Sequence, residues 1–336
     1  MRLVGTKALR PGDVLDAPIL TSSGRVILSA ETVLTENYIK KIKQMGVHKV
    51  YINDSRFDDV ELTSNSVDDR IKNEATQVLE DAYKNLHTEK TADEYILKDI
   101  SKSLVDYVRE TKEKGVSILS LKAADDYIIE HSINVSILTA FLGNQMNFNY
   151  NQLCDLVTGA LIHDLGRENE KEENHEHVQK GFDVMRKCRG LSLHSAIVCF
   201  EHHENFDGSG YPRKLKGEAI SDFSRIIRVA DLYDNLLHGY GSQDIPMMPH
   251  QAYENILAVS GSIVDPRIVE TFRDTIIFYP NGCTVLLSNG LCGVIVRQNQ
   301  GSPQRPVVRT FDDSGIIGEI DLLKNLTLSV KDVVTE

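Results

Sequence analysis

The stretch HHENFDGSGYP, residues 202–212, places two histidines directly before a loop with two glycines and a Tyr-Pro pair. It continues the apolar run LHSAIVCFE, whose pattern predicts a helix that ends at the histidines. Histidine is the commonest metal-binding side chain, and glycine lets a backbone turn tightly or approach another group closely. The stretch therefore predicts metal ligands at a helix end, beside a tight turn. A turn that sets shape alone, without contact to a substrate, is the open alternative.

Other histidines and aspartates occur in comparable positions, next to apolar segments or glycines. Six of the eleven histidines lie between residues 163 and 203. Imidazole and carboxylate groups without cysteine suit Zn, Fe, Mn or Ni rather than a structural thiolate zinc site. The candidate ligands are His131 in EHSINVSILTAF, His163 and Asp164 at the end of LVTGALIHD, His177, His202, His203, and Asp231 in RIIRVADLYDNL.

This set of side chains has the composition of a binuclear site. In hydrolytic enzymes two metal ions about 3.5–4 Å apart share a bridging group, lower the pKa of a water and neutralise a phosphoryl oxygen. Adjacent ligands such as His163 and Asp164 reach inward together only at a helix end or an irregular turn, and Gly166 follows them. Taken alone, His131 is more often a packed histidine, so the prediction depends on the whole set.

Three motifs together resemble a known family. HDLGR at 163–167, HHENFDGSGYP and RIIRVADLYD resemble the HD-GYP family of metal-dependent cyclic di-GMP phosphodiesterases, a branch of the HD superfamily. The resemblance covers roughly residues 116–275, and residues 276–320 are similar to the tail that often follows this domain. It implies a helical bundle with the metals in its core. It places His131, His163, Asp164 and Asp231 on one metal, with Asp164 bridging, and His177, His202 and His203 on the second.

The resemblance also implies a reaction and its participants. Two divalent transition metal ions, Fe or Mn, would hold a hydroxide that opens cyclic di-GMP to linear pGpG, GMP or both, in bacterial second-messenger signalling. Some members bind three metals through a carboxylate one helical turn before the first histidine, and Tyr127 in that position favours two. The implied catalytic residues are Asp164 and Arg167, and the implied substrate-binding residues are Arg167, Gly208, Gly210, Tyr211 and Pro212.

The sequence departs from the family pattern at three places. Arg167 replaces the usual lysine near the scissile phosphate, which keeps the charge but changes its geometry; a surface charge is the alternative. Residues 168–176 form a short acidic connection where the family has a longer segment that helps to cover the pocket. No arginine follows Asp234 in LLHGYGSQD, where the family often has one that binds phosphate. Asp234 is either a support for a ligand or a capping residue.

These departures leave three functions open. The first is the cyclic di-GMP phosphodiesterase that the resemblance implies. The second is a catalytically weak or inactive HD-GYP module, which binds a ligand and signals to a partner through the N-terminal part of the chain. The third is a phosphodiesterase for another cyclic dinucleotide. Rapid turnover would exclude the second, and a panel of substrates would separate the first from the third.

Changes in hydrophobic periodicity divide the remainder of the chain. Residues 1–54 have the pattern of a small α/β domain, with a hairpin around 22–24 and a helix from about Thr35 to a stop at Gly46. Residues 276–336 form a small β extension, in which Asn289-Gly290 between apolar runs predicts a hairpin. The predicted fold class is multidomain and mainly α, with these two smaller parts at its ends.

Residues 55–115 contain a polar linker and two amphipathic helices. The second helix opens at Thr91 with a capping box, and its apolar stripe includes Ile96 and Ile100. The two stripes can pair with each other or with a second copy of the chain. A homodimer is therefore one of the open alternatives.

Composition limits the partners and the compartment. The net charge of −12 argues against duplex nucleic acid, which proteins bind through basic surfaces. No apolar run is long enough to predict a membrane span, and the N-terminus has no secretory signal. We therefore expect a cytoplasmic protein whose five cysteines are free thiols.

Overall fold

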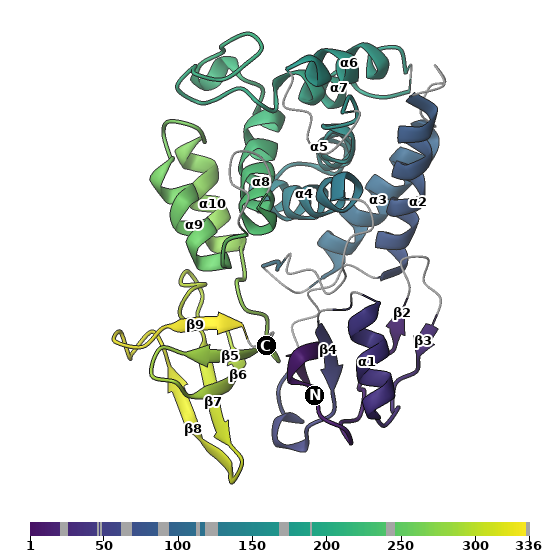
Figure 1. Cartoon of the computed structure of the whole chain (residues 1–336). Coiled ribbons are helices and arrows are strands. Elements are labelled where there is room, and N and C mark those ends of the chain that lie inside the picture. The colour runs from purple at the N-terminus through teal and green to yellow at the C-terminus, as the bar shows by residue number, and fades with distance from the viewer. Residues whose placement is uncertain are drawn as a thin grey trace. The chain divides into compact units, whose positions relative to one another are not determined.

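The structure, a computed structural model, consists of two compact units (Figure 1). The first takes in residues 1–66 and 276–336, and the second 67–118 and 126–275. The predicted fold class is confirmed: mainly α, with a small α/β part and a small β part. The structure describes residues 1–20, 26–45, 47, 49–61, 69–86, 94–111, 115–117, 127–167, 175–188, 190–239 and 246–333.

The N-terminal part of the first unit is a small α/β arrangement. Its elements are β1 (Arg2–Gly5), η1 (Thr6–Ala8), β2 (Ile19–Leu20), β3 (Val26–Leu28), α1 (Glu36–Gln44), β4 (Lys49–Ile52) and η2 (Ser55–Phe57). β1 pairs with β4, and β2 with β3, both antiparallel. The Thr35 side chain caps α1 by accepting a hydrogen bond from the Tyr38 backbone. The predicted hairpin and helix are confirmed, while the turn at 22–24 and the stop at Gly46 lie outside the described residues.

The C-terminal part is a five-stranded antiparallel sheet in the order β8-β7-β6-β5-β9. Its strands are β5 (Thr284–Leu287), β6 (Cys292–Arg297), β7 (Val307–Asp312), β8 (Gly315–Asp321) and β9 (Val330–Val333). β5 and β6 form the hairpin that Asn289-Gly290 predicts, and Gly290 adopts the positive φ of 86° that such a turn requires.

The two ends of the chain meet within this first unit. The Leu3 backbone N–H donates to the carbonyl of Gly282 at 2.7 Å. Arg309 on β7 forms a two-pronged ion pair with Asp59, at 2.6 and 2.8 Å. The fully buried Phe57 ring lies edge-on to Phe311, with 5.5 Å between ring centroids. Phe57, in the segment expected to be a linker, is therefore packed in a core.

The second unit is a helical bundle built around α4, which is buried along nearly its whole length. Its helices are α2 (Asp69–Leu86), α3 (Glu94–Glu110), α4 (Tyr127–Gln145), α5 (Tyr150–Ile162), α6 (Glu176–Met185), α7 (Leu193–Glu201), η3 (Gly217–Ala219), α8 (Asp222–His238), α9 (Pro249–Ala258) and α10 (Pro266–Thr275). α5 and α8 both pack on α4, and α7 packs on α5, α6 and α8. α4 is buried on all sides and has no solvent face, so it occupies the centre of the bundle (Figure 1).

α2 and α3 pack against each other and against α4, within the same chain. The predicted stripe of α3 is wrong at one position: Ile96 is 44% exposed, and Leu97 beside it is buried with Ile100. The rest of the predicted stripe is buried, at Ile100, Leu104 and Val108, and Leu97, three residues before Ile100 and seven before Leu104, begins the buried face. The capping box predicted at Thr91 lies outside the described residues.

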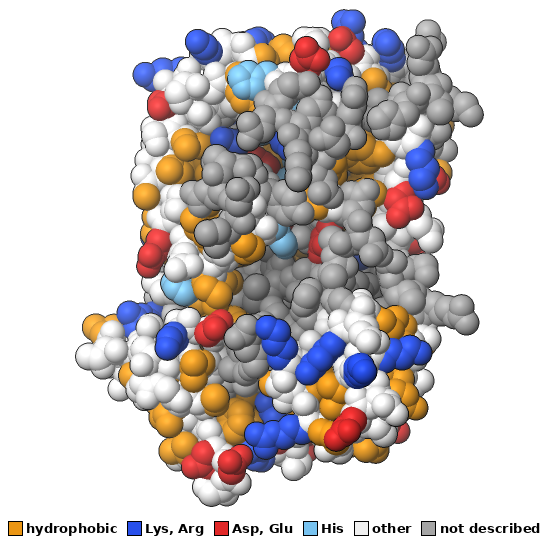
Figure 2. Space-filling model, viewed as in Figure 1, with side chains coloured by type: hydrophobic (Ala, Val, Ile, Leu, Met, Phe, Trp, Pro, Cys, Tyr) orange, Lys and Arg blue, Asp and Glu red, His pale blue; other side chains and the backbone are white. Residues whose placement is uncertain are grey.

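Local interactions fix the helices that approach the centre of the bundle. Asn149 and Gln152 form a reciprocal capping box at the start of α5. Arg225 on α8 forms a buried ion pair with Asp265, at 2.5 Å, just before α10 begins. On the face seen in Figure 2, acidic and basic side chains are interspersed among apolar ones. Among the described residues, no helix is both long and apolar enough to span a bilayer.

Candidate metal centre

The seven predicted ligands converge in the core of the helical bundle, although they come from five places along the chain. His131 is on α4, His163 and Asp164 follow the end of α5, and His177 is on α6. His202 and His203 follow α7 directly, and Asp231 is on α8. All of these side chains are buried except His203, which is partly buried.

The first group of ligands consists of His131, His163 and Asp231, with one oxygen of Asp164. The Nε2 atoms of His131 and His163 lie 3.2 Å apart. Asp231 Oδ1 is 3.2 Å from His131 Nε2 and 4.0 Å from His163 Nε2. Asp164 Oδ2 completes the group at 3.7 Å from His163 Nε2 and 3.9 Å from His131 Nε2.

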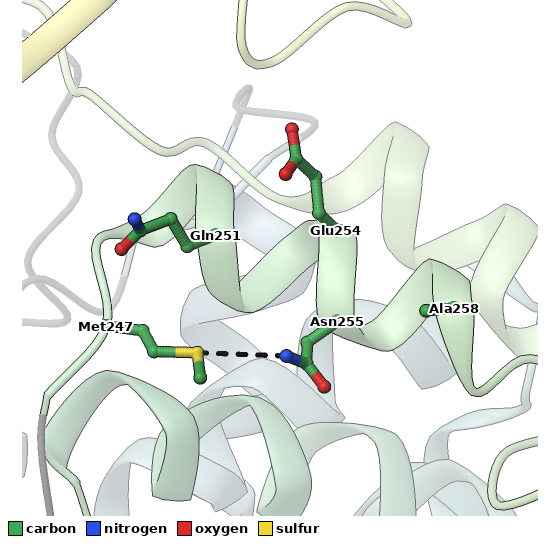
Figure 3. Close-up of a pocket in the computed structure, with 5 residues that line it drawn as sticks. All are labelled: Met247, Gln251, Glu254, Asn255 and Ala258. Atoms are coloured by element: carbon green, nitrogen blue, oxygen red, sulfur yellow. Dashed lines mark hydrogen bonds between the residues drawn. The ribbon is translucent and has the colours of Figure 1, made fainter.

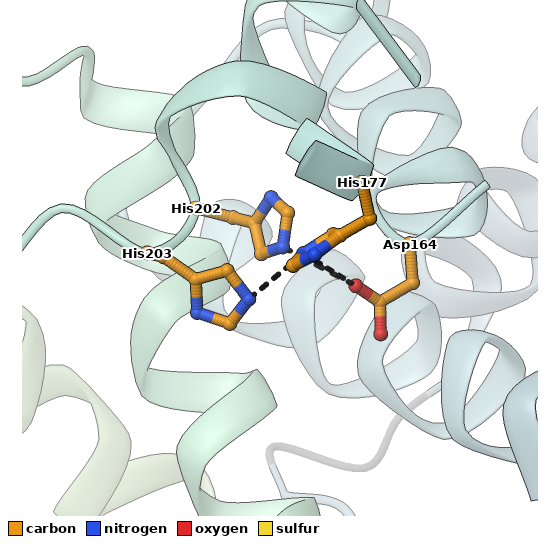
Figure 4. A group of neighbouring side chains, drawn as sticks. All are labelled: Asp164, His177, His202 and His203. Atoms are coloured by element: carbon orange, nitrogen blue, oxygen red, sulfur yellow. Dashed lines mark hydrogen bonds and ion pairs between the residues drawn. The ribbon is translucent and has the colours of Figure 1, made fainter. Parts of the chain in front are cut away.

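The second group consists of His177, His202 and His203, with the other oxygen of Asp164 (Figure 4). Asp164 Oδ1 is 3.3 Å from His202 Nε2 and 3.7 Å from His177 Nε2. His177 Nε2 and His203 Nε2 are 3.1 Å apart. Asp164 thus directs one carboxylate oxygen to each group, which is the arrangement that a bridging ligand needs.

Hydrogen bonds on the outer nitrogens orient three of the imidazoles. His163 Nδ1 lies 2.7 Å from the Ala160 carbonyl, and His202 Nδ1 lies 3.0 Å from the Val198 carbonyl. A carbonyl only accepts, so Nδ1 carries the hydrogen in both rings and Nε2 presents a lone pair to the centre. His131 Nδ1 is 2.7 Å from the Asp234 carboxylate. Asp234 is therefore a support for a ligand, one of the two roles that the sequence left open.

The unsatisfied atoms of the centre fit a divalent metal pair. Asp164 Oδ1 and His202 Nε2 are buried, and neither makes a hydrogen bond. Buried polar atoms without partners are costly. A cation in each group would satisfy these atoms, and imidazole with carboxylate is a donor set that divalent transition metals accept.

Charges around the centre keep its acids ionised, and burial keeps His163 neutral. Burial opposes ionisation of Asp164, but Arg167 together with His163 and His202 holds its pKa well below the usual range. Burial also opposes ionisation of Asp231, whose pKa is lowered by His131 and Arg228. Burial lowers the pKa of His163 to about 4. These are the protonation states in which a carboxylate and an imidazole bind metals.

His131 differs from the other imidazoles. Burial would lower its pKa, but hydrogen bonds to Asp231 and Asp234 raise it to about 10. The hydroxyl of Tyr127 lies 3.1 Å from His131 Nδ1 and donates to the side-chain oxygen of Asn235 at 2.8 Å. Tyr127 occupies the position at which three-metal family members carry a carboxylate. Its phenol contacts His131 and Asn235.

The loop after His203 has the close backbone approach that its glycines predict. Gly208 has φ of 86°, a conformation that other residues adopt with strain. Gly210 is needed for a different reason: a Cβ there would lie 2.4 Å from the His203 carbonyl and 2.3 Å from the Asn205 nitrogen. Tyr211, which precedes Pro212 through a cis bond, stacks on His203 with ring centroids 4.8 Å apart.

Two acidic residues that the sequence analysis did not single out hold this loop in place. Glu204 accepts hydrogen bonds from the backbone of Arg213 at 2.7 Å and of Leu215 at 2.9 Å. Glu201 accepts from the Ser221 backbone at 3.0 Å and pairs with the Arg213 guanidinium. Both glutamates are buried. Their positions directly before and after the histidine pair, in FEHHE, are the sequence feature from which their role could have been predicted.

Two arginines lie next to the carboxylates of Asp164 and Asp231. Arg167, predicted as a catalytic or surface residue, is only 19% exposed, and its Nε lies 2.9 Å from Asp164 Oδ2. Arg228 was missed, although it precedes Asp231 by one helical turn, and its guanidinium donates to Asp231 Oδ2 at 3.0 Å. Residues 168–174 of the short acidic connection lie outside the described residues, as do residues 240–245.

A separate surface hollow in the second unit carries less chemistry. It has a volume of about 380 Å³, and Asn255 directs its amide to the Met247 sulfur, 3.9 Å away (Figure 3). Its lining is Met247, Gln251, Glu254, Asn255 and Ala258. Glu254 is the single titratable side chain among these five lining residues. None of the predicted site residues lies there.

Comparisons with known proteins agree with the geometry of the bundle. Residues 123–268 match the HD domain family model, and residues 284–336 match the KOW domain associated with HD domain. The chain is 29% identical to a cyclic di-GMP phosphodiesterase of Pseudomonas aeruginosa, over 58% of this chain and 50% of that protein. It is 25% identical to the cyclic di-GMP phosphodiesterase PdeB of Borreliella burgdorferi, over 64% of this chain and 62% of that protein.

A third relative acts on a different nucleotide. The 3′3′-cGAMP-specific phosphodiesterase 2 of Vibrio cholerae is 31% identical, over 34% of this chain and 22% of that protein. The chain thus spans between a half and two thirds of the first two relatives, and less of this one.

Among solved structures, an HDG“Y”P protein from Bdellovibrio bacteriovorus shares the fold with a TM-score of 0.53 at 15% identity, covering 80% of this chain and 97% of that one. The family predicted from the three motifs is confirmed. Residues 123–268 are therefore similar to an HD domain, and residues 284–336 to a KOW domain of the sort that accompanies HD domains.

Proposed function

We propose that this chain is a metal-dependent phosphodiesterase that hydrolyses a cyclic dinucleotide, with cyclic di-GMP as the first candidate. The observation that carries the proposal is the position of Asp164, whose two oxygens face two separate groups of imidazoles. The P. aeruginosa and B. burgdorferi relatives, named as cyclic di-GMP phosphodiesterases, support the choice of substrate.

The proposed ligands of the first metal are His131, His163, Asp164 and Asp231, and those of the second are Asp164, His177, His202 and His203. A pair of divalent ions, Fe or Mn in our proposal, lowers the pKa of a bound water and neutralises phosphoryl charge when present. In the overall reaction, water adds its oxygen to one phosphorus, and the bond from that phosphorus to the ribose 3′-oxygen breaks. The 3′-oxygen takes up a proton, which gives linear pGpG; the same reaction on pGpG gives GMP.

The protein side chains would position the substrate around this centre. The Arg167 guanidinium is fixed beside the Asp164 carboxylate, so it can donate to a phosphoryl oxygen at the reacting end. Gly208 and Gly210 let the loop close tightly after His203, and Tyr211 and Pro212 form its rim. The Tyr211 ring covers His203, which excludes water from one side of the second group.

The decisive experiment is hydrolysis by anaerobically purified protein loaded with Fe²⁺ or Mn²⁺, with metal counted on the same sample. We expect consumption of cyclic di-GMP, and products identified by chromatography against pGpG and GMP standards. 3′3′-cGAMP is the second substrate, because the V. cholerae relative is named for it; faster turnover of cGAMP would reassign the substrate. Tight binding without any product would instead identify a signalling module.

Metal uptake is expected to release a proton from His131. Because the pKa of His131 is about 10, this ring is protonated at pH 8, and a cation at Nε2 must displace that proton. Adding Mn²⁺ to metal-free protein at pH 8 should release about one proton per chain from this group, and the apparent affinity should rise about tenfold per pH unit between pH 7 and 9.

A pH indicator in weakly buffered solution measures this release. A bound water can also lose a proton, so the control is His131→Gln, which should release about one proton fewer than the wild type. Equal release by the two proteins would show that His131 is neutral before metal binds.

A further inference from the structure

Arg228 is a second guanidinium at the centre, beside Asp231, whereas Arg167 is beside Asp164. It lies on α8, one turn before Asp231, and donates to Asp231 Oδ2 at 3.0 Å. Its other terminal nitrogen lies 3.2 Å from the side-chain oxygen of Asn205, in the loop that leads to Tyr211. Its Nε is buried and has no hydrogen-bond partner. The side chain is 16% exposed, so it has unused hydrogen-bonding capacity at a site that retains access to solvent.

Arg228 donates to only one oxygen of Asp231, Oδ2. The other oxygen, Oδ1, accepts a hydrogen bond from the Asn235 amide at 2.6 Å and lies 3.2 Å from His131 Nε2. A metal ion at this carboxylate would reduce its negative charge further. A guanidinium kept beside a cation site is unfavourable by Coulomb repulsion unless an anion joins them. The surplus of positive charge therefore points to an anionic ligand.

Arg228 and Arg167 lie beside different carboxylates of the same centre. The Arg167 guanidinium is next to Asp164, and the Arg228 guanidinium is next to Asp231. A cyclic dinucleotide has two phosphodiester groups, and two cations beside two groups of proposed metal ligands suit such an anion.

We propose that Arg228 binds a phosphodiester oxygen of the substrate, and so supplies the cation that the family pattern places after Asp234. The inference rests on the proposed function, since it names a substrate contact of the same site. Arg228 has a second potential role, because its bond to Asn205 links α8 to the loop. The experiment must therefore separate a charge that binds phosphate from a group that only holds the loop.

The test compares Arg228→Gln, Arg228→Lys and Asn205→Ala with the wild type. Binding is measured by fluorescence anisotropy of labelled cyclic di-GMP on metal-free protein, and KM and kcat are measured on Mn²⁺-loaded protein. Loss of a charge-assisted hydrogen bond should raise the Kd and KM of Arg228→Gln about 10-fold to 100-fold, with a smaller change in kcat. Arg228→Lys keeps the charge and should recover most of that loss, and Asn205→Ala should change Kd by less than about threefold.

Metal content and thermal midpoint, both expected to be unchanged in Arg228→Gln, exclude damage to the centre. Arg273→Gln on α10 is the matched control, because Arg273 is 47% exposed and pairs with Asp274 away from the ligands. Wild-type Kd and KM in Arg228→Gln, or an equal loss in Asn205→Ala, overturns this inference while the proposed function stands. A wild-type protein that neither binds nor hydrolyses a cyclic dinucleotide overturns both.

Discussion

Asp164→Asn is expected to lower hydrolysis of cyclic di-GMP at least about a thousandfold and to reduce bound metal from about two ions per chain to one or fewer. The physical reason is that, in the part of the chain that the structure describes, Asp164 is the carboxylate that faces both groups of imidazoles, with Oδ1 at 3.3 Å from His202 and Oδ2 at 3.7 Å from His163. Asparagine has the same shape but no charge, and only one of its two terminal atoms can bind a metal. Turnover and metal content, measured on one preparation, check the result.

The matched control is Asp183→Asn on α6, a residue that is 39% exposed and pairs with Arg186 on the surface. It should keep wild-type turnover and metal content, because exposed ion pairs contribute little. Thermal unfolding of both variants in metal-free form shows whether either disturbs the fold. Unchanged turnover in Asp164→Asn would rule out the proposed mechanism; retained metal with lost turnover would limit the role of Asp164 to the reaction itself.

The proposed ligands of this centre could be singled out in the sequence because each belongs to a short local pattern. His163 and Asp164 end an apolar run, His202 and His203 end another, and Asp231 lies within a third. Periodicity places each at the end or on the buried face of a helix. That the five segments meet at one point follows from the resemblance to a family and not from periodicity, because packing of distant helices leaves no trace in local spacing.

Two features of the fold were out of reach of local reasoning. The joining of the chain's two ends depends on pairs such as Leu3 with Gly282 and Arg309 with Asp59, which are 279 and 250 residues apart in sequence. The family pattern has a phosphate-binding arginine after Asp234, and the sequence has none there. The structure instead places the guanidinium of Arg228 one helical turn before Asp231. Helical spacing of three residues was the available signal, and it is a weak one, because arginine and aspartate at that distance also pair on ordinary surfaces.

Gly166→Ala is expected to lose the second metal ion and to lower turnover about a hundredfold, although residue 166 is not itself a proposed ligand. A Cβ at this position would lie 2.0 Å from the His177 carbonyl and 2.6 Å from the Gly181 nitrogen. Both neighbours are backbone atoms of α6, so no rotamer change relieves the clash. The turn that carries Asp164 must separate from the helix that carries His177, and that separation opens the second group. Metal counting and turnover measure the effect. Overpacking should also lower the free energy of unfolding by about 1–3 kcal/mol, which is seen as a lower thermal midpoint.

The requirement at Gly166 is one of close approach, because a Cβ contact below 3.0 Å has to be relieved by movement of the backbone. Two other glycines, with looser surroundings, serve as controls. At Gly159 the nearest contact is the Val198 side chain at 3.0 Å, which can yield, so Gly159→Ala should keep its metal. At Gly318 nothing lies within 4 Å, so Gly318→Ala should match the wild type in every measurement. If Gly166→Ala also keeps two ions and full turnover, α6 can move without displacing His177, and the second group does not depend on the contact between this turn and that helix.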